Sequence, residues 1–120
     1  MSNKITILGQ EYKFIIKAYD EDPLFEKLRA SGYCDTVAKQ IVICDMHTFP
    51  EFKDESEEYI EIIQKQFTRH EIVHAFLEEC GLSMNTHIPE DGWARNEEMV
   101  DWIAIKGPKI FELWKELDLL

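Results

Sequence analysis

The sequence predicts an α+β fold in which a small N-terminal β-sheet packs on one long helix, with further helices at the C-terminal end. Two patterns lead to this prediction. Apolar residues alternate in the N-terminal part, as in strands, and from about residue 54 they recur every three or four positions, as in helices. A chain of 120 residues, 45% of them hydrophobic, suits a single domain spanning residues 1–120.

Four short strands are expected in the N-terminal part. The partial alternation over residues 4–18, interrupted at Gly9-Gln10, predicts a hairpin. Residues 24–28 should form one helical turn, and residues 33–36 and 41–44 a second pair of strands. Residues 41–44 are the most apolar of the four.

The longest element should be a helix from about residue 54 to Cys80, ended by Gly81. One face of this helix consists of Ile60, Ile63, Phe67, His70, His74 and Leu77. Because the two histidines continue an apolar stripe, both should point toward the core.

After a loop over residues 83–92, a second helix should run from residues 93–96 to Lys106. Gly107-Pro108 should separate it from a final helix. The aromatic residues of these helices are expected in the core rather than against a substrate: Trp102, Phe111 and Trp114.

Charge and composition limit the possible partners. The net charge of −11 disfavours binding to nucleic acid or to anionic lipid surfaces. The acidic residues between positions 51 and 61 suit the start of a helix, and a surface for basic peptides is the alternative. The three cysteines are widely spaced, which predicts reduced thiols. The sequence also lacks the long apolar run of a leader or a membrane span, so we expect a cytoplasmic protein.

His70 and His74 are the strongest candidates for chemistry. Residues four apart on a helix lie on one face, so the two imidazoles can reach one ion, and imidazole suits zinc. Glu71 follows the first histidine directly and is the candidate general base. A catalytic zinc site needs a third protein ligand and one open position.

The second helix offers Glu97, Glu98 and Asp101 for this third position. Glu97 and Asp101 share a face with Val100 and Ala104, so we favour Glu97 as ligand and Asp101 as the group that orients His70. Glu98 is the lesser candidate. The alternative for both glutamates is an ordinary charged first turn capped by Asn96. His87, in the loop, and His47 are possible extra ligands or oxyanion donors, although exposed spectator histidines are commoner.

His-Glu-Ile-Val-His at 70–74, followed by Asn-Glu-Glu-Met-Val-Asp at 96–101, resembles the gluzincin arrangement of zinc metallopeptidases. The segment 97–104 is also similar to a pattern of ImmA/IrrE-type metallopeptidases, and the chain resembles small zincin-like proteins of phages and bacteria. The resemblance covers about residues 70–104. It implies a minimal zincin-like domain with His70, His74 and Glu97 as zinc ligands and Asp101 behind them.

The expected function is therefore zinc-dependent hydrolysis of a peptide bond, with Glu71 as base and a peptide or protein as substrate. An extended substrate is expected to pair with the sheet edge, for which residues 41–44 are the favoured strand. The alternative function is a zinc-stabilised interaction module without catalysis, and hydrolysis of a non-peptide amide would use the same residues.

Overall fold

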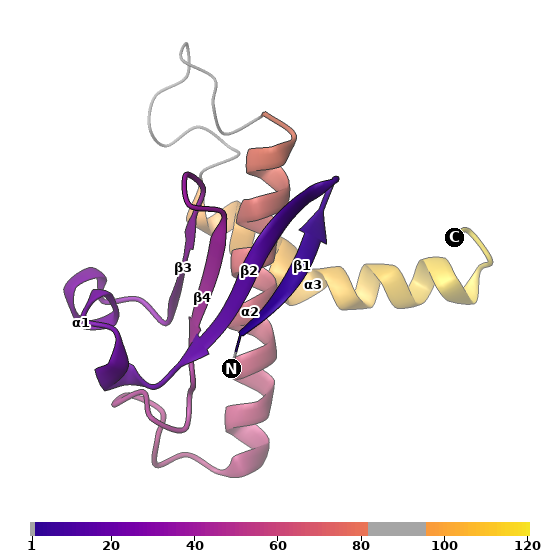
Figure 1. Cartoon of the computed structure of the whole chain (residues 1–120). Helices are drawn as coiled ribbons and strands as arrows, with labels where there is room; N and C mark the ends of the chain where they lie inside the picture. The colour runs from indigo at the N-terminus through magenta and orange to yellow at the C-terminus, as the bar shows by residue number, and fades with distance from the viewer. Residues whose placement is uncertain (1, 82–95) are drawn as a thin grey trace.

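The computed structural model describes residues 2–81 and 96–120, and Figure 1 shows their arrangement. A sheet contains the strands β1 (Ser2–Ile7), β2 (Gln10–Lys17), β3 (Gly32–Asp35) and β4 (Gln40–Cys44). The short helices η1 (Tyr19–Glu21) and α1 (Leu24–Leu28) lie between β2 and β3, and the long helices α2 (Glu57–Glu79) and α3 (Glu97–Glu116) follow the sheet. The expected α+β class is confirmed.

The strands are ordered β1-β2-β4-β3. The β1–β2 hairpin is antiparallel, as expected from its sequence, and β4 pairs antiparallel with β3. β4 also pairs parallel with β2 and is therefore an inner strand. The expectation that residues 41–44 form an edge for substrate pairing is wrong. Edges of this sheet are β1 and β3.

The side chains of Ile41, Val42, Ile43 and Cys44 are all buried, which suits a strand covered on both faces. Val42 and Cys44 pack with Phe25 and with Ile60 and Ile63 of α2. Ile41 and Ile43 belong to a second cluster that includes Ala75 near the other end of α2. This helix is thus fixed to the sheet along much of its length.

Helix α2 begins three residues later than expected. Ser56 caps it, because the Ser56 hydroxyl accepts a hydrogen bond from the Tyr59 amide at 3.2 Å. The other end, at Glu79, lies one residue before the expected one, with Gly81 at a positive φ of 79° donating its amide proton to the Glu78 carbonyl.

Helix α3 differs from expectation, because it continues through Gly107-Pro108 instead of ending there. A proline inside a helix deprives the carbonyl four residues earlier of its donor, here that of Ala104. Arg69 of α2 replaces this donor: its Nε donates to the Ala104 carbonyl oxygen at 2.6 Å. A side chain from another helix therefore allows α3 to remain continuous.

The N-terminal half of α3 packs on α2, whereas its C-terminal half points away from the sheet and from α2 (Figure 1). Trp102, Phe111 and Trp114 are 53%, 54% and 48% exposed, so the expectation that they form part of the core is wrong. None of the described helices has the length and apolar content required to cross a membrane. Cys34, Cys44 and Cys80 are all unpaired.

Candidate metal centre

His70 and His74 lie one turn apart on α2, and their Nε2 atoms are 3.2 Å apart. Both side chains are largely shielded from solvent, with 14% and 21% of their surfaces exposed. The helical spacing of the motif thus brings the two imidazole nitrogens to one place.

Glu97 contacts both imidazoles from the first turn of α3. Its Oε2 lies 2.9 Å from Nε2 of His70, and its Oε1 lies 2.9 Å from Nε2 of His74. Asn96 caps this turn by accepting a hydrogen bond from the Met99 amide at 2.9 Å. The capped first turn that the sequence offered as an alternative to a ligand is present and holds Glu97 at the histidines.

Asp101 lies on the other side of the His70 ring, with its Oδ1 2.6 Å from Nδ1. An ionised carboxylate only accepts hydrogen bonds, so Nδ1 of His70 donates to it. In the neutral ring this leaves the lone pair on Nε2, the atom nearest to Glu97 and His74.

Two carboxylates compete for the third position of a metal site. His70, Glu71 and His74 form a group whose possible ligand atoms all lie within 4.8 Å of one another. Within the group, however, the nearest Glu71 oxygen is 3.9 Å from Nε2 of His70, whereas Glu97 is 2.9 Å from each histidine. The shorter distances favour Glu97, which leaves Glu71 beside the site.

The spacing of these atoms suits a single zinc ion. Tetrahedral ligands at about 2.0–2.1 Å from zinc lie about 3.3 Å from one another. The two Nε2 atoms are 3.2 Å apart, and each lies 2.9 Å from a different oxygen of the Glu97 carboxylate. The separation of the two nitrogens is close to that of two ligands of one zinc ion.

Burial lowers the pKa of His74 below its ordinary value, although the negative charge of Glu97 opposes this effect. A lower pKa keeps the ring neutral near pH 7, and a neutral imidazole is the form that binds metal.

Glu71 is 7% exposed, and its Oε2 is the only buried side-chain oxygen or nitrogen in the described residues without a hydrogen-bond partner. Burial raises the pKa of Glu71 to about 7, an effect that His70 partly offsets. An unpaired buried carboxylate oxygen is costly, so its presence beside two histidines points to a missing polar partner at this site.

A cleft of about 240 Å³ opens at the candidate centre. On one side it is bounded by β3 and the segment before it, on the other by α2 and α3. Its lining residues are Arg29, Ala30, Ser31, Gly32, Phe67, His70, Glu71, Glu97 and Asp101.

Gly32 allows β3 to lie close to the Val42 carbonyl of β4, with Glu71 of α2 beside it in this cleft. A Cβ atom at residue 32 would lie 2.9 Å from the Val42 carbonyl oxygen and 3.4 Å from Cγ of Glu71. The sequence reasoning missed this part of the site, because the approach of β3 to α2 depends on the sheet order. The only local signal was a glycine at the start of a strand.

Two other predicted candidates, Glu98 and His47, do not join this centre. Glu98 is exposed on the first turn of α3, next to Glu97 but without its contacts to the imidazoles. His47 lies between Asp45 and Glu57, at distances of 2.7 and 2.9 Å, near the start of α2 and about 20 Å along that helix from His70. His87 lies outside the described residues.

Comparisons of this chain with protein-family models, with curated proteins and with solved structures find no match. The geometry of the centre therefore carries the functional argument.

Proposed function

We propose that this chain is a zinc-dependent metallopeptidase of the zincin type, with His70, His74 and Glu97 as metal ligands and Glu71 as general base. The observation that carries the proposal is the convergence of two imidazoles of α2 and one carboxylate of α3 at 2.9–3.2 Å. Glu71 supports catalysis rather than a purely structural metal site, because a structural site needs no unpaired carboxylate beside its ligands.

His70, His74 and Glu97 would hold the zinc ion, which would act as a Lewis acid toward a water and the carbonyl oxygen of the substrate. The residues of the chain move the protons. Glu71 accepts one proton of the attacking water, the water oxygen bonds to the carbonyl carbon, and the carbon–nitrogen bond breaks. Glu71 then returns the proton to the leaving amine.

Asp101 has a positioning role in this scheme. By accepting the Nδ1 proton of His70 at 2.6 Å, it keeps the ring turned so that Nε2 points to Glu97 and His74.

The strand β3 is the favoured binding edge for an extended substrate. Among the residues that the structure describes, it pairs with β4 alone, and Gly32 at its start lines the same cleft as Glu71. An extended peptide aligned on this edge would bind through main-chain hydrogen bonds, which require little sequence specificity. In this proposal β3 replaces residues 41–44 as the edge to which the substrate binds.

The proposal is tested by zinc analysis of purified protein together with cleavage of a peptide library. Wild type should bind one zinc ion per chain and cleave. Glu71→Gln should keep the zinc and lose cleavage, because the amide cannot accept the proton. Glu98→Gln is the matched control and should keep both properties. Cleavage retained by Glu71→Gln would reject the assigned base.

Removal of zinc by a chelator separates this proposal from the alternative of a zinc-stabilised interaction module. A protein that stays folded but no longer cleaves supports catalysis. Unfolding on chelation, with no cleavage by the zinc-bound protein, supports the structural role instead.

A further inference from the structure

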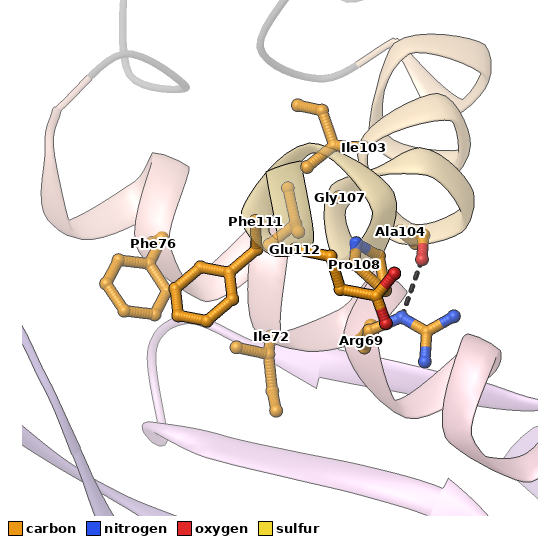
Figure 2. Close-up of a pocket in the computed structure, with 10 residues that line it drawn as sticks. Arg69, Ile72, Phe76, Ile103, Ala104, Gly107, Pro108, Phe111 and Glu112 are labelled. Atoms are coloured by element: carbon orange, nitrogen blue, oxygen red, sulfur yellow. Dashed lines mark hydrogen bonds between the residues drawn. The ribbon is translucent and has the colours of Figure 1, made fainter. Parts of the chain in front are cut away.

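Two features of α2 lie away from the metal centre. One is an apolar groove against α3, where the rings of Phe76 and Phe111 lie at the same end (Figure 2). The other is a charged contact near the opposite end of the helix, where His47 meets Asp45 and Glu57. Both ring nitrogens of His47 have partners, so the chemistry of this contact follows from its geometry.

His47 belongs to the connection between β4 and α2, and its imidazole ring lies between two carboxylates. Nδ1 is 2.7 Å from Oδ1 of Asp45, the residue that follows β4. Nε2 is 2.9 Å from each carboxylate oxygen of Glu57, the first residue of α2. Among the described residues these two carboxylates are the charged groups that face the ring. The ring therefore bridges the end of β4 and the beginning of α2.

This geometry determines the protonation of the ring. An ionised carboxylate only accepts hydrogen bonds, and a neutral imidazole has a single N–H to donate. Both contacts can be hydrogen bonds at once only when both ring nitrogens carry a proton, which makes His47 an imidazolium. The hydrogen bonds and negative charges of Glu57 and Asp45 accordingly raise the pKa of His47 above its ordinary value of 6.5, although burial acts in the opposite direction.

Asp45 and Glu57 hold the ring unequally. Oδ1 of Asp45 also accepts the main-chain amide proton of His47 at 3.0 Å, so this carboxylate is part of a local turn. The side chain of Asp45 is 40% exposed, whereas that of Glu57 is 75% exposed. A neutral ring keeps one N–H, which we expect to stay at Nδ1 on Asp45, so the lone pair of Nε2 then repels the oxygens of Glu57. Loss of the proton thus acts on the helix side of the bridge.

The beginning of α2 is sensitive to this loss because of its charge. Residues 51–61 contain six carboxylates and one lysine, and like charges close together repel one another. Two other contacts of this connection do not titrate near neutral pH: the Met46 amide donates to Oε1 of Gln64 at 2.8 Å, and Ser56 caps the helix. Loss of the proton should therefore loosen the first turn of α2 and leave the sheet in place.

We propose that Asp45, His47 and Glu57 form a pH-sensitive latch. With an imidazolium at its centre the latch ties the first turn of α2 to the end of β4, and with a neutral ring it releases Glu57. Because the folded-state pKa of His47 is raised, the latch stabilises the folded state fully below the unfolded-state value of about 6.5, and this contribution is lost as pH rises through the folded-state value. The inference does not depend on the proposed peptidase activity.

NMR spectroscopy of the full chain between about pH 5 and 9 tests the latch. Ring nitrogen shifts follow the proton of His47. The exchange protection of the Ile60 amide, which donates to the Ser56 carbonyl at 2.9 Å, follows the first turn of α2. His47 should titrate above pH 6.5. The protection of Ile60, corrected for the intrinsic pH dependence of exchange, should fall with the same midpoint by up to about fivefold.

Three variants make the test specific. Glu57→Gln should lower the midpoint of His47, because a neutral amide exerts no charge on the ring. His47→Gln should remove the pH dependence of the Ile60 protection. Glu58→Gln is the matched control, because it removes an exposed charge from the same helix turn but leaves both carboxylates at the ring in place, and it should leave the midpoint nearly unchanged.

A His47 midpoint at or below 6.5 overturns the latch. So does an Ile60 protection that stays constant with pH or falls equally in His47→Gln. A midpoint lowered as much by Glu58→Gln as by Glu57→Gln would mean that the general negative charge of the chain holds the proton, which also rejects the latch. Far-UV circular dichroism shows whether each variant is folded, and the wild-type titration decides the question should a variant fail to fold.

Discussion

Arg69 of α2 donates from its Nε to the carbonyl oxygen of Ala104 on α3 at 2.6 Å, and Pro108 is the residue that leaves this carbonyl without its helical donor. Ala104 is 1% exposed, so water is a poor substitute. The contact lies one residue before His70 on α2 and three residues after Asp101 on α3. It therefore fixes the two helices next to the candidate metal centre.

Arg69→Met should lower the free energy of unfolding by about 1–3 kcal/mol, because a buried carbonyl loses its donor. In a Pro108→Ala background the main-chain amide of residue 108 can donate to the Ala104 carbonyl. Arg69→Met should therefore lower the free energy of unfolding by less in this background than in the wild type. Urea unfolding of the two single variants and the double variant measures this coupling. Equal costs of Arg69→Met in both backgrounds would contradict the assigned role.

Lys65→Met provides the control for Arg69→Met. Lys65 is another cation of α2, but its partner Glu61 is exposed and 3.2 Å away. Loss of such a surface pair should change stability by less than about 1 kcal/mol.

Asp101→Asn should weaken zinc binding by about 10–100-fold while leaving the three proposed ligands in place, because the ring of His70 loses the carboxylate that orients it. Competition with a chromophoric chelator measures the affinity. Glu98→Gln removes a neighbouring charge from the same helix turn and should leave the affinity nearly unchanged. An Asp101→Asn protein with wild-type affinity would exclude the positioning role.

Gly32→Ala should destabilise the fold by about 1–3 kcal/mol, because the added Cβ would lie 2.9 Å from the Val42 carbonyl, a main-chain atom that cannot easily move. Gly107→Ala offers the comparison. That glycine has nothing within 4 Å of a built Cβ and lies inside α3, so alanine should stabilise by about 0.5–1 kcal/mol. Thermal unfolding of both variants is the measurement, and a neutral Gly32→Ala would show that β3 can shift away from the Val42 carbonyl of β4.

Asp22 should make stability depend on pH in the acid range. Burial alone would raise the pKa of Asp22, but hydrogen bonds from the Tyr33 hydroxyl, the Leu24 amide and Lys17 lower it below the ordinary value of 3.8. The ionised carboxylate therefore stabilises the folded state above the unfolded-state pKa, and this contribution is lost as pH falls through the lower folded-state pKa.

Asp22→Asn should lower the free energy of unfolding by about 1–3 kcal/mol at pH 7, because the half-buried partners lose their charged acceptor. The difference from wild type should narrow as pH falls below about 4, where the wild-type carboxylate takes up a proton. Chemical denaturation at a series of pH values checks both statements. A difference that is constant down to pH 2 would show that the charge of Asp22 has no part in the effect.

Short-range patterns in the sequence were sufficient to predict most elements. The hairpin around Gly9, the end of α2 just before Gly81 and the shared face of Glu97 and Asp101 each follow from local signals within a few residues. The spacing of Glu97 and Asp101 brings both within hydrogen-bond distance of His70, although their functional roles stay predictions.

The wrong expectations came from long-range contacts. Pro108 has the sequence signal of a helix end, and only a side chain 39 positions earlier, Arg69, allows the helix to continue. Residues 41–44 are a different case, because a strand with four apolar residues in succession is typical of an inner strand, and the signal against an edge was present. The role of Gly32 depended on the order of strands, which no local pattern determines.

The two imidazoles belong to α2, while the carboxylates that touch them, Glu97 and Asp101, belong to α3. An ion held between them would cross-link the two helices, so occupancy and the angle at which α3 leaves α2 must be thermodynamically linked. Any binding event that changes this angle would change the affinity for the ion by the same factor by which the ion changes that binding event.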